Sequence, residues 1–273
     1  NCWGNLRRWM ANQVHHAIWH REIYSYVGVL ECLTGMPFDV EFITFDEIKE
    51  GIPEDIKVII NAGDAHTAFS GGDNWIDEKV VTAIREFVDN GGGFIGVGEP
   101  TAYQFEGRYF QLSDVMGVDR EMNFSLSTDK YNEMNADHFI LEDIEGDIDF
   151  GEGMSRIYAQ GENYQILSMD GEYSQLVVNS YGEGRSVYFA GLPYSPQNCR
   201  ILLRAIYFAA GMEAEMKKFY VTNVDTEVTV FEKTGKLAVA NNADEAKHTD
   251  LYINGKLAHS LDMQPREMRW LDL

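Results

Sequence analysis

The stretch VDNGGGFIGVGEPTA, residues 88–102, decides the fold of this chain. Its run FIGVG at 94–98 is short and apolar on both faces, as is typical of a parallel strand buried between helices. Upstream, apolar residues at 76, 80, 84, 87 and 88 recur at helical spacing, which predicts a helix ending at Asn90. The glycines at 91–93 then supply the left-handed backbone that a helix C-terminus needs. Helix, glycine turn and buried strand together predict an α/β fold.

Segments on both sides of this stretch fit the same fold. Strands are predicted at residues 38–44 and 57–61, and near 155–159, 164–168, 175–181 and 185–191, from their β-branched and aromatic residues. A helix is predicted from Ser195, its N-cap, through Pro196 at its first position to Gly211 just past its end. Strands separated by helices indicate right-handed crossovers and a parallel, doubly wound sheet. The consecutive late strands indicate an antiparallel extension at one edge.

The last part of the chain has a different pattern. From Lys218 onward apolar and polar residues alternate, and no helical period of useful length occurs. Thr234-Gly235 and Asn254-Gly255 predict turns, the second being a strong hairpin signal. We therefore predict an α/β domain at residues 1–215 and a small antiparallel β domain at residues 216–273. Because a domain of about 55 residues has only a marginal core of its own, we expect the β domain to depend on packing against its neighbour for stability.

The beginning of the chain predicts a missing strand. Asn1-Cys2-Trp3-Gly4 leads directly into the helix-like stretch LRRWMANQVHHAIWH, whereas in a doubly wound fold such a turn follows the first strand. The sequence begins without a methionine and without a secretory signal segment. We therefore expect the chain to be a piece of a longer protein that lacks all or most of the first strand of its sheet.

Composition excludes several classes of function. The 273 residues carry 44 acidic and 22 basic side chains, a net charge of −22, with 45% hydrophobic and 12% aromatic residues. This composition is that of a globular protein, and so acidic a surface repels the phosphates of nucleic acid. No stretch approaches the roughly 20 apolar residues of a membrane span. Three scattered cysteines, Cys2, Cys32 and Cys199, favour a reducing, cytoplasmic setting over a disulfide framework.

The turn after the strand at 94–98 is the most informative candidate site, because ligands of open parallel sheets bind beyond the carboxyl ends of the strands. In class I glutamine amidotransferase-like domains this elbow is Gly-x-Cys-x-Gly and holds the nucleophile. Here Glu99 occupies that position and no cysteine falls at an elbow, so amidotransferase chemistry is not expected. In one interpretation Glu99 hydrogen-bonds sugar hydroxyls or supports a neighbouring domain. In the other it caps the next segment or pairs with a cation.

Asp64 is a parallel case, since it follows the predicted strand that ends at Asn61. One interpretation makes Asp64 and His66 an acid–base pair. The other makes Asp64 an Asx-turn residue beside an exposed histidine.

A basic helix-like stretch near the beginning is a third candidate. His16 and His20 lie one helical turn apart, but a glutamate at the right position and a third zinc ligand are missing. The stretch also holds three arginines and a further histidine, namely Arg7, Arg8, Arg21 and His15. It serves an anionic ligand, or it pairs with acidic neighbours and packs at an interface. We predict no metal site, and no GxxxxGK[ST] phosphate loop occurs.

Four long stretches resemble a single family. They are VHHAIWHREIYSYVGVLECLTGMPFDVEFITFDEI, VIINAGDAHTAFSGG, VDNGGGFIGVGEPTAYQFEGRYFQLSDVMGV and VYFAGLPYSPQNCRILLRAIYFAAG. They look like the 1,3-β-galactosyl-N-acetylhexosamine phosphorylases, also called lacto-N-biose or galacto-N-biose phosphorylases, of glycoside hydrolase family 112. The resemblance runs over nearly the entire chain, including the terminal β domain.

The resemblance implies a three-part protein. A catalytic (β/α)₈ barrel comes first, then a class I glutamine amidotransferase-like (flavodoxin-like) α/β domain without its cysteine, then a small β domain. This chain resembles the second and third parts only, so no catalytic residue is expected in it. The implied reaction is inverting phosphorolysis, in which phosphate attacks the galactosyl carbon while a carboxylic acid protonates the leaving oxygen.

The resemblance also implies the reactants and the role of this portion. Its products are α-galactose 1-phosphate and N-acetylhexosamine, with inorganic phosphate as co-substrate and no metal or organic cofactor; because some members prefer galactosyl-rhamnose, the acceptor stays open. The α/β domain would wall the substrate cleft, support a homodimer, or both. From position alone, the substrate-facing candidates are Asp64, Glu99, Arg8 and His16. Two alternatives stay open: a free-standing amidotransferase-like hydrolase using Glu99 or Asp64, and a sugar-binding or oligomerisation module.

Overall fold

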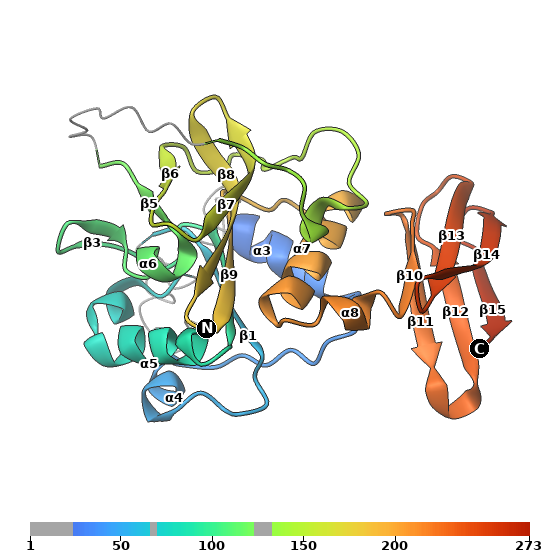
Figure 1. The fold of residues 1–273 in the computed structure, drawn as a ribbon, viewed down its shortest axis with the longest axis horizontal. Helices are drawn as coiled ribbons and strands as arrows, with labels where there is room; N and C mark the ends of the chain where they lie inside the picture. The colour runs from blue at the N-terminus through green and yellow to red at the C-terminus, as the bar shows by residue number, and fades with distance from the viewer. Residues whose placement is uncertain (1–23, 66–69, 123–132) are drawn as a thin grey trace, which may run out of the picture.

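A five-stranded sheet forms the centre of the larger part of the molecule in this computed structural model, which describes residues 24–65, 70–122 and 133–273 (Figure 1). Its strands lie in the order β1 (Val58–Gly63), β2 (Gly93–Gly98), β9 (Gly184–Phe189), β8 (Tyr173–Tyr181) and β7 (Tyr164–Asp170). The first three strands are parallel to one another, β8 runs antiparallel to β9, and β7 runs antiparallel to β8. The predicted antiparallel extension at one edge is therefore confirmed.

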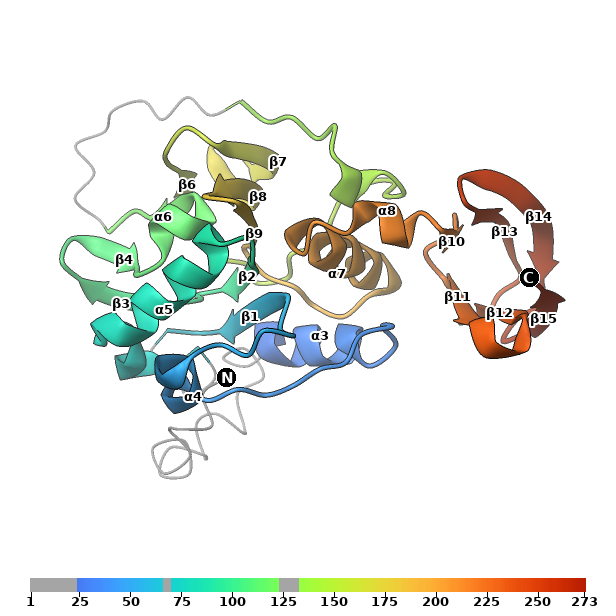
Figure 2. The same cartoon turned by 60° about the horizontal axis from the view of Figure 1, so that its bottom comes forward.

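Helices cover both faces of this sheet (Figure 2). On one face, α3 (Tyr24–Leu33) and α7 (Pro196–Ala209) contact each other and the parallel strands. On the other face lie α5 (Glu78–Asp89) and the short α6 (Ser113–Met116). The parallel strand β2 is buried along its whole length between these layers, as its apolar sequence predicts.

Helix α7 begins where the sequence predicts and α5 ends there, with Asn90 as its C-cap, whereas Ile76, which the spacing assigned to the same helix, lies in the preceding 3₁₀ helix η3 (Gly72–Ile76). Asp77 caps α5 by accepting a 3.0 Å hydrogen bond from the Lys79 amide, and the buried residues of α5 recur at helical spacing. Ser195 caps α7 by accepting from the Asn198 amide at 3.0 Å, and Pro196 is its first residue. Capping and periodicity are local signals, which is why the sequence shows them directly.

The predicted strand at residues 38–44 is wrong. The segment 39–44 pairs with no described strand, and Thr44 instead caps the short helix α4 (Phe45–Glu50) through a capping box with Glu47. Aromatic and β-branched residues favour extended backbone, but a strand also requires a neighbour that accepts and donates its hydrogen bonds.

Smaller elements connect the main ones. Two short antiparallel pairs lie outside the central sheet, namely β3 (Ala102–Phe105) with β4 (Arg108–Phe110), and β5 (Val118–Arg120) with β6 (Ile157–Ala159). The 3₁₀ helices are η3 (Gly72–Ile76), η4 (Phe139–Leu141) and η5 (Glu232–Thr234). The strand predicted near 155–159 is therefore present as β6, but it pairs with β5 outside the central sheet.

A β domain follows α8 (Glu213–Met216) at one end of the molecule (Figure 1). It holds two three-stranded antiparallel sheets, one of β10 (Phe219–Val221), β13 (Lys247–Ile253) and β14 (Lys256–Met263), the other of β11 (Thr226–Phe231), β12 (Lys236–Asn241) and β15 (Met268–Asp272). Asn254 and Gly255 both have positive φ, 51° and 73°, so the predicted hairpin turn is confirmed. A small apolar cluster, including Leu237, Leu251 and Met263, fills the space between the sheets.

Buried charges on α7 tie the β domain to the larger part. Arg200 donates to the carbonyl oxygens of Val221 at 2.8 Å, Asn223 at 3.2 Å and Thr226 at 3.3 Å. Its guanidinium also donates to Asp143 at 2.9 Å. These bonds give the small domain polar anchorage that its own core does not supply.

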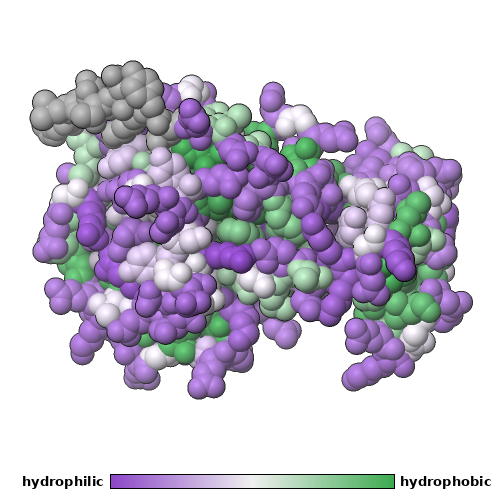
Figure 3. Space-filling view, viewed as in Figure 1, coloured by the Kyte–Doolittle hydropathy of each residue, from purple (hydrophilic) through white to green (hydrophobic). Residues whose placement is uncertain are grey.

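Hydrophilic side chains dominate the face of the molecule shown in Figure 3, and apolar patches interrupt them on the β domain. Exposed apolar residues of that domain include Phe231, Leu257, Met268 and Trp270. Among the described residues, no helix has the length and apolar character needed to cross a membrane.

Candidate functional site

Two turns meet at the carboxyl ends of β1 and β2, where open parallel sheets bind ligands. β1 ends at Gly63 and β2 at Gly98, both with positive φ, so each strand turns sharply away from the sheet. The Glu99 amide then donates to the Gly63 carbonyl at 3.0 Å, which extends the ladder by one bond. Glu99 therefore sits at the elbow that the sequence predicts.

The Glu99 carboxylate is held by three groups from three different segments. One of its oxygens accepts from the Ala65 amide at 2.8 Å, in the turn after β1. The other oxygen accepts from the Tyr109 hydroxyl and from the Arg120 guanidinium, the latter at 2.9 Å. Only 14% of the Glu99 side chain is exposed. Such a carboxylate joins the loops at the strand ends and is poorly placed to act as a nucleophile.

Tyr109 and Arg120 complete this cluster. Arg120 donates to the Tyr109 hydroxyl oxygen at 2.8 Å, and its guanidinium carbon lies 4.8 Å from the centre of the Tyr109 ring. Asp119, buried next to Arg120, accepts from the amides of Tyr109, Phe110 and Arg120. Burial raises the pKa of Asp119, whereas these three amide bonds lower it. The amides thus hold β4 and β5 in the register that aims Tyr109 and Arg120 at Glu99.

The buried side chain of Asn61, in β1, also holds the elbow in place. Asn61 donates to the Ser70 carbonyl at 3.1 Å and accepts from the Thr101 amide at 2.9 Å. Thr101 is fully buried and has a φ of 56°, a conformation that non-glycine residues adopt at a cost. The Asn61 side chain therefore stabilises a strained turn directly after Glu99-Pro100.

The phenol of Tyr109 reports on the charge of Glu99. Burial first, and then the Glu99 carboxylate, raise the pKa of Tyr109 above its usual value near 10. Because the folded pKa lies above the unfolded one, the neutral phenol stabilises the fold fully below about pH 10, and this stabilisation is lost as the pH rises further. We expect Glu99→Gln to lower the pKa of Tyr109, measured as tyrosinate absorbance in an alkaline titration.

Tyr109→Phe supplies the control for that titration. Subtracting the titration curve of Tyr109→Phe from that of the wild type isolates the titration of Tyr109 from that of the other tyrosines. The curve of the Glu99→Gln/Tyr109→Phe double variant is subtracted from that of Glu99→Gln in the same way. An unchanged midpoint in Glu99→Gln would contradict the coupling between the two side chains.

The structure shows the surroundings of some sequence-predicted residues and not of others. Glu99 pairs with a cation, one of the interpretations left open above. Asp64 lies just past β1, half-buried, and its carbonyl oxygen accepts from the Ser70 hydroxyl at 2.5 Å. His66 lies outside the described residues, as do all members of the basic stretch, namely Arg7, Arg8, His15, His16, His20 and Arg21.

Sequence reasoning missed the partners of Glu99. It also missed the role of Asn61, which bonds Ser70 and Thr101 and carried a weak signal as the polar residue at the end of a predicted apolar strand. Tyr109 and Arg120 carried none, because they lie 10 and 21 positions from Glu99 in short elements that the sequence did not predict. Sequence reasoning also missed the contact between the thiols of Cys32 in α3 and Cys199 in α7, which hydrogen-bond each other. That hydrogen bond, together with burial, raises the pKa of Cys32.

The described residues contain no group of three or more His, Cys, Asp and Glu side chains that are placed to hold a metal ion. What the cluster at the strand ends does offer is a neutralised carboxylate, a protonated phenol and a guanidinium. Such groups position loops or hydrogen-bond hydroxyls.

Comparison with known proteins finds a matching family model for each of the two parts of the chain. Residues 1–214 match the lacto-N-biose phosphorylase central domain, and residues 219–271 match the lacto-N-biose phosphorylase C-terminal domain. A 1,3-β-galactosyl-N-acetylhexosamine phosphorylase of Lachnoclostridium phytofermentans is 49% identical over 99% of the chain and 37% of its own length. The enzyme of that name from Bifidobacterium longum is 39% identical over 99% of the chain and 40% of its own length.

A third relative has a different name. The D-galactosyl-β-1→4-L-rhamnose phosphorylase of L. phytofermentans is 31% identical over 94% of the chain and 34% of its own length. The chain thus spans between 34% and 40% of the length of these three relatives.

Proposed function

The chain belongs to the lacto-N-biose phosphorylase family, and on that premise we propose that it forms the central and C-terminal part of a galactoside phosphorylase. The full-length enzyme would reversibly convert β-1,3-galactosyl-N-acetylhexosamine and inorganic phosphate into α-galactose 1-phosphate and N-acetylhexosamine. The observation that carries this proposal is the 49% identity to a phosphorylase of that name across 99% of the chain.

The proposed reaction inverts the anomeric carbon. A phosphate oxygen forms a bond to the galactosyl carbon from the face opposite the glycosidic oxygen, and that glycosidic bond breaks. A carboxylic acid gives its proton to the leaving oxygen, as in inverting glycosidases with phosphate in place of water. We propose that these groups lie outside residues 1–273, in a barrel domain, and that no metal or organic cofactor takes part.

Within the chain, the proposed role is architectural. The Glu99 cluster supports it, because its carboxylate is already neutralised by Arg120 and its hydrogen bonds hold three loops together at the strand ends. Loops fixed in this way suit a wall of the substrate cleft, with Asp64, Arg8 and His16 as further substrate-facing candidates. The same commitment of Glu99 argues against the alternative of a free-standing hydrolase that uses it.

We also propose that the α/β part is an amidotransferase-like domain without its nucleophile. Three parallel strands with helices on both faces, an antiparallel edge and the elbow at Glu99 support that assignment. A homodimer and a cytoplasmic location belong to the same proposal. The N-acetylhexosamine acceptor is preferred over rhamnose, since identity is 39–49% to relatives named for the former and 31% to the relative named for the latter.

The test compares the 273-residue chain with the full-length polypeptide. Each is incubated with lacto-N-biose, galacto-N-biose or galactosyl-rhamnose in the presence of phosphate, and galactose 1-phosphate is measured by NMR. We expect the α anomer from the full-length protein, with an N-acetylhexosamine disaccharide preferred, and no product from the chain alone. Product from the chain alone would show that catalytic residues lie within it, and a β anomer would contradict inversion.

A further inference from the structure

Two cysteine side chains meet between helices α3 and α7, on one face of the central sheet. Cys32 lies near the end of α3 and Cys199 in the first turn of α7, and their thiols hydrogen-bond each other. Both are free thiols in the structure. We call Cys32 and Cys199 the thiol pair.

The packing of α3 against the start of α7 holds the thiol pair together. A β-carbon at position 28 would lie 1.8 Å from the carbonyl oxygen of Leu192, so the backbone of α3 meets the turn before α7 with no side chain between them. The backbone amide of Ser195, the N-cap of α7, donates to the sulfur of Cys32. The two sulfurs are therefore neighbours because of contacts that involve the backbone, which a change of rotamer does not undo.

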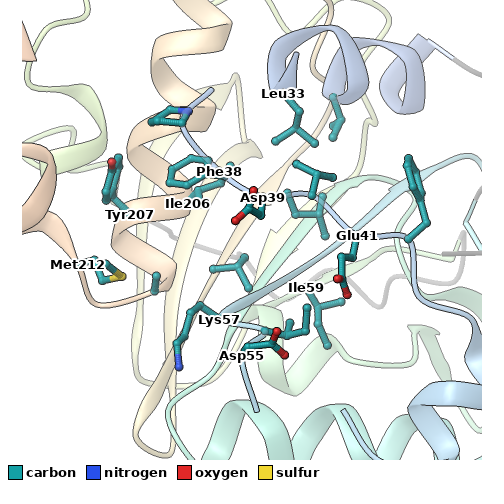
Figure 4. Close-up of a pocket in the computed structure, with 18 of the residues that line it drawn as sticks. Leu33, Phe38, Asp39, Glu41, Asp55, Lys57, Ile59, Ile206, Tyr207 and Met212 are labelled. Carbon is teal, nitrogen blue, oxygen red and sulfur yellow. The ribbon is translucent and has the colours of Figure 1, made fainter. Parts of the chain in front are cut away.

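A cavity beside the two helices leaves room for a bond to form between the sulfurs. A disulfide requires the sulfurs to move from hydrogen-bonding distance to about 2 Å. Leu33, next to Cys32 in the sequence, lines a cavity of about 600 Å³ together with Ile206 and Tyr207 of α7 (Figure 4). Because a close-packed interior resists displacement and a cavity does not, the end of α3 can shift toward α7 without overpacking.

The two thiols differ in access and in acidity. Cys32 is 2% exposed, whereas Cys199 is only partly buried and lies near Tyr194, which is 57% exposed. The hydrogen bond from Cys32 lowers the pKa of Cys199 and raises that of Cys32, while the carboxylates of Glu227 and Glu31 oppose the ionisation of Cys199. The first turn of a helix also favours a thiolate. Cys199 is thus the thiol that ionises first and that a solute reaches.

We propose that the thiol pair is a redox-sensitive modification site, which a peroxide converts into a reversible disulfide between α3 and α7. The Cys199 thiolate attacks one peroxide oxygen, the O–O bond breaks, and Cys199 becomes a sulfenic acid while the other oxygen leaves as water. The Cys32 thiol then loses its proton, its sulfur bonds to that of Cys199, and the sulfenic oxygen leaves as a second water. One peroxide and two thiols give one disulfide and two waters, and an added dithiol reverses the change.

The disulfide would cross-link helices that meet at the joint between the two parts of the chain. Arg200, directly after Cys199, donates to three carbonyl oxygens of the β domain. A β-carbon at Gly35, just past the end of α3, would lie 3.3 Å from a carboxylate oxygen of Glu227 in β11. Oxidation therefore restricts movement of α3, α7 and the β domain relative to one another. In a reducing setting such a disulfide is transient, as is typical of redox-sensing cysteines.

Thiol mapping of the 273-residue chain tests the proposal. The reduced chain is treated with equimolar hydrogen peroxide, remaining thiols are blocked with N-ethylmaleimide, and peptide mapping without reduction locates each cysteine by mass spectrometry. We expect one linked pair of peptides, Cys32 with Cys199, which dithiothreitol separates, and a blocked thiol at Cys2, which lies outside the described residues. Blocked thiols at both Cys32 and Cys199, a bond from either to Cys2, or a sulfinic acid at Cys199 overturns the proposal.

Two variants test the order of the steps. Cys32→Ala removes the thiol that closes the disulfide, so Cys199 is expected to accumulate as a sulfenic acid that dimedone labels. Cys199→Ala leaves only the buried thiol, so Cys32 is expected to stay reduced and unlabelled. Labelling of Cys32 in the second variant equal to that of Cys199 in the first contradicts the assignment of Cys199 as the attacking thiol.

Thermal unfolding provides a second readout. Because a disulfide restricts the unfolded chain, the unfolding midpoint of the oxidised wild type is expected to rise by about 5 °C or more and to return on addition of dithiothreitol. Cys2→Ser is the matched control and keeps this rise, whereas Cys32→Ala and Cys199→Ala lose it. An unchanged midpoint after oxidation overturns the cross-link. Neither readout involves phosphorolysis, so failure of the proposed function and failure of the redox proposal are distinguishable.

Discussion

Replacing Asp143 by alanine is expected to lower the free energy of unfolding by about 3–5 kcal/mol, since it leaves two buried guanidinium groups without their shared counter-ion. The Asp143 carboxylate accepts from Arg200 at 2.9 Å and from Arg204 at 3.0 Å. The two arginine side chains are only 7% and 2% exposed, and Asp143 is 12% exposed. Burial already lowers the pKa of Arg200, and Asp143 is the nearest charge that opposes this effect.

The loss extends beyond one ion pair, because Arg200 also donates to three carbonyl oxygens of the β domain. A guanidinium that moves toward water after Asp143→Ala gives up those bonds as well. Urea denaturation of the chain, followed by circular dichroism and by tryptophan fluorescence, measures the change.

The adjacent residue provides a matched control for Asp143→Ala. Glu142 pairs with the same Arg204 at 3.3 Å and with Lys217 at 2.8 Å, but its side chain is 42% exposed. Because solvent screens exposed pairs, Glu142→Ala is expected to cost no more than about 1 kcal/mol. Similar losses in the two variants would show that burial of the arginines does not set the energy of this cluster.

Replacing Gly28 by alanine is expected to destabilise the fold by about 2 kcal/mol, although α3 gains helix propensity. A β-carbon at position 28 would lie 1.8 Å from the carbonyl oxygen of Leu192 and 3.4 Å from the α-carbon of Pro193. These are backbone atoms of the turn after β9, so no side-chain rotation relieves the clash. Overpacking costs up to about 3 kcal/mol of stability, and alanine stabilises a helix by roughly 1 kcal/mol relative to glycine. The expected net loss in the free energy of unfolding is the difference between the two.

Glu31→Ala, on the exposed side of the same helix, is the control for Gly28→Ala. Its unfolding free energy is expected to stay within about 0.5 kcal/mol of the wild type. Both variants are measured by thermal and urea unfolding of the chain. A Gly28→Ala protein as stable as the wild type, or more stable, would mean that α3 does not approach the turn after β9 as closely as the structure places it.

Much of the fold was predictable because its signals are local. The cap at Ser195, the proline at 196, the glycines at 91–93 and the hairpin turn at Asn254-Gly255 each act within a few residues of themselves. The buried strand β2 is recognisable for the same reason. The family was evident too, since long motifs persist over the whole chain and match both family domains.

The segment 38–44 shows the limit of prediction from local sequence signals. Its composition is that of a strand, yet a strand exists only where another strand meets its backbone groups, and the described residues provide none there.

By itself the sequence determined the strands of the central sheet, the long helices α5 and α7, that Glu99 occupies the elbow after a buried parallel strand, and the family to which the chain belongs. Only the tertiary structure decided that Glu99 pairs with Arg120 and accepts a hydrogen bond from Tyr109, that Asp143 joins two buried arginines, and that Gly28 leaves no room for a β-carbon. The physical reason is distance along the chain. Propensity, capping and periodicity depend on neighbouring residues, whereas these contacts join residues that are close only after the sheet and its helices have packed.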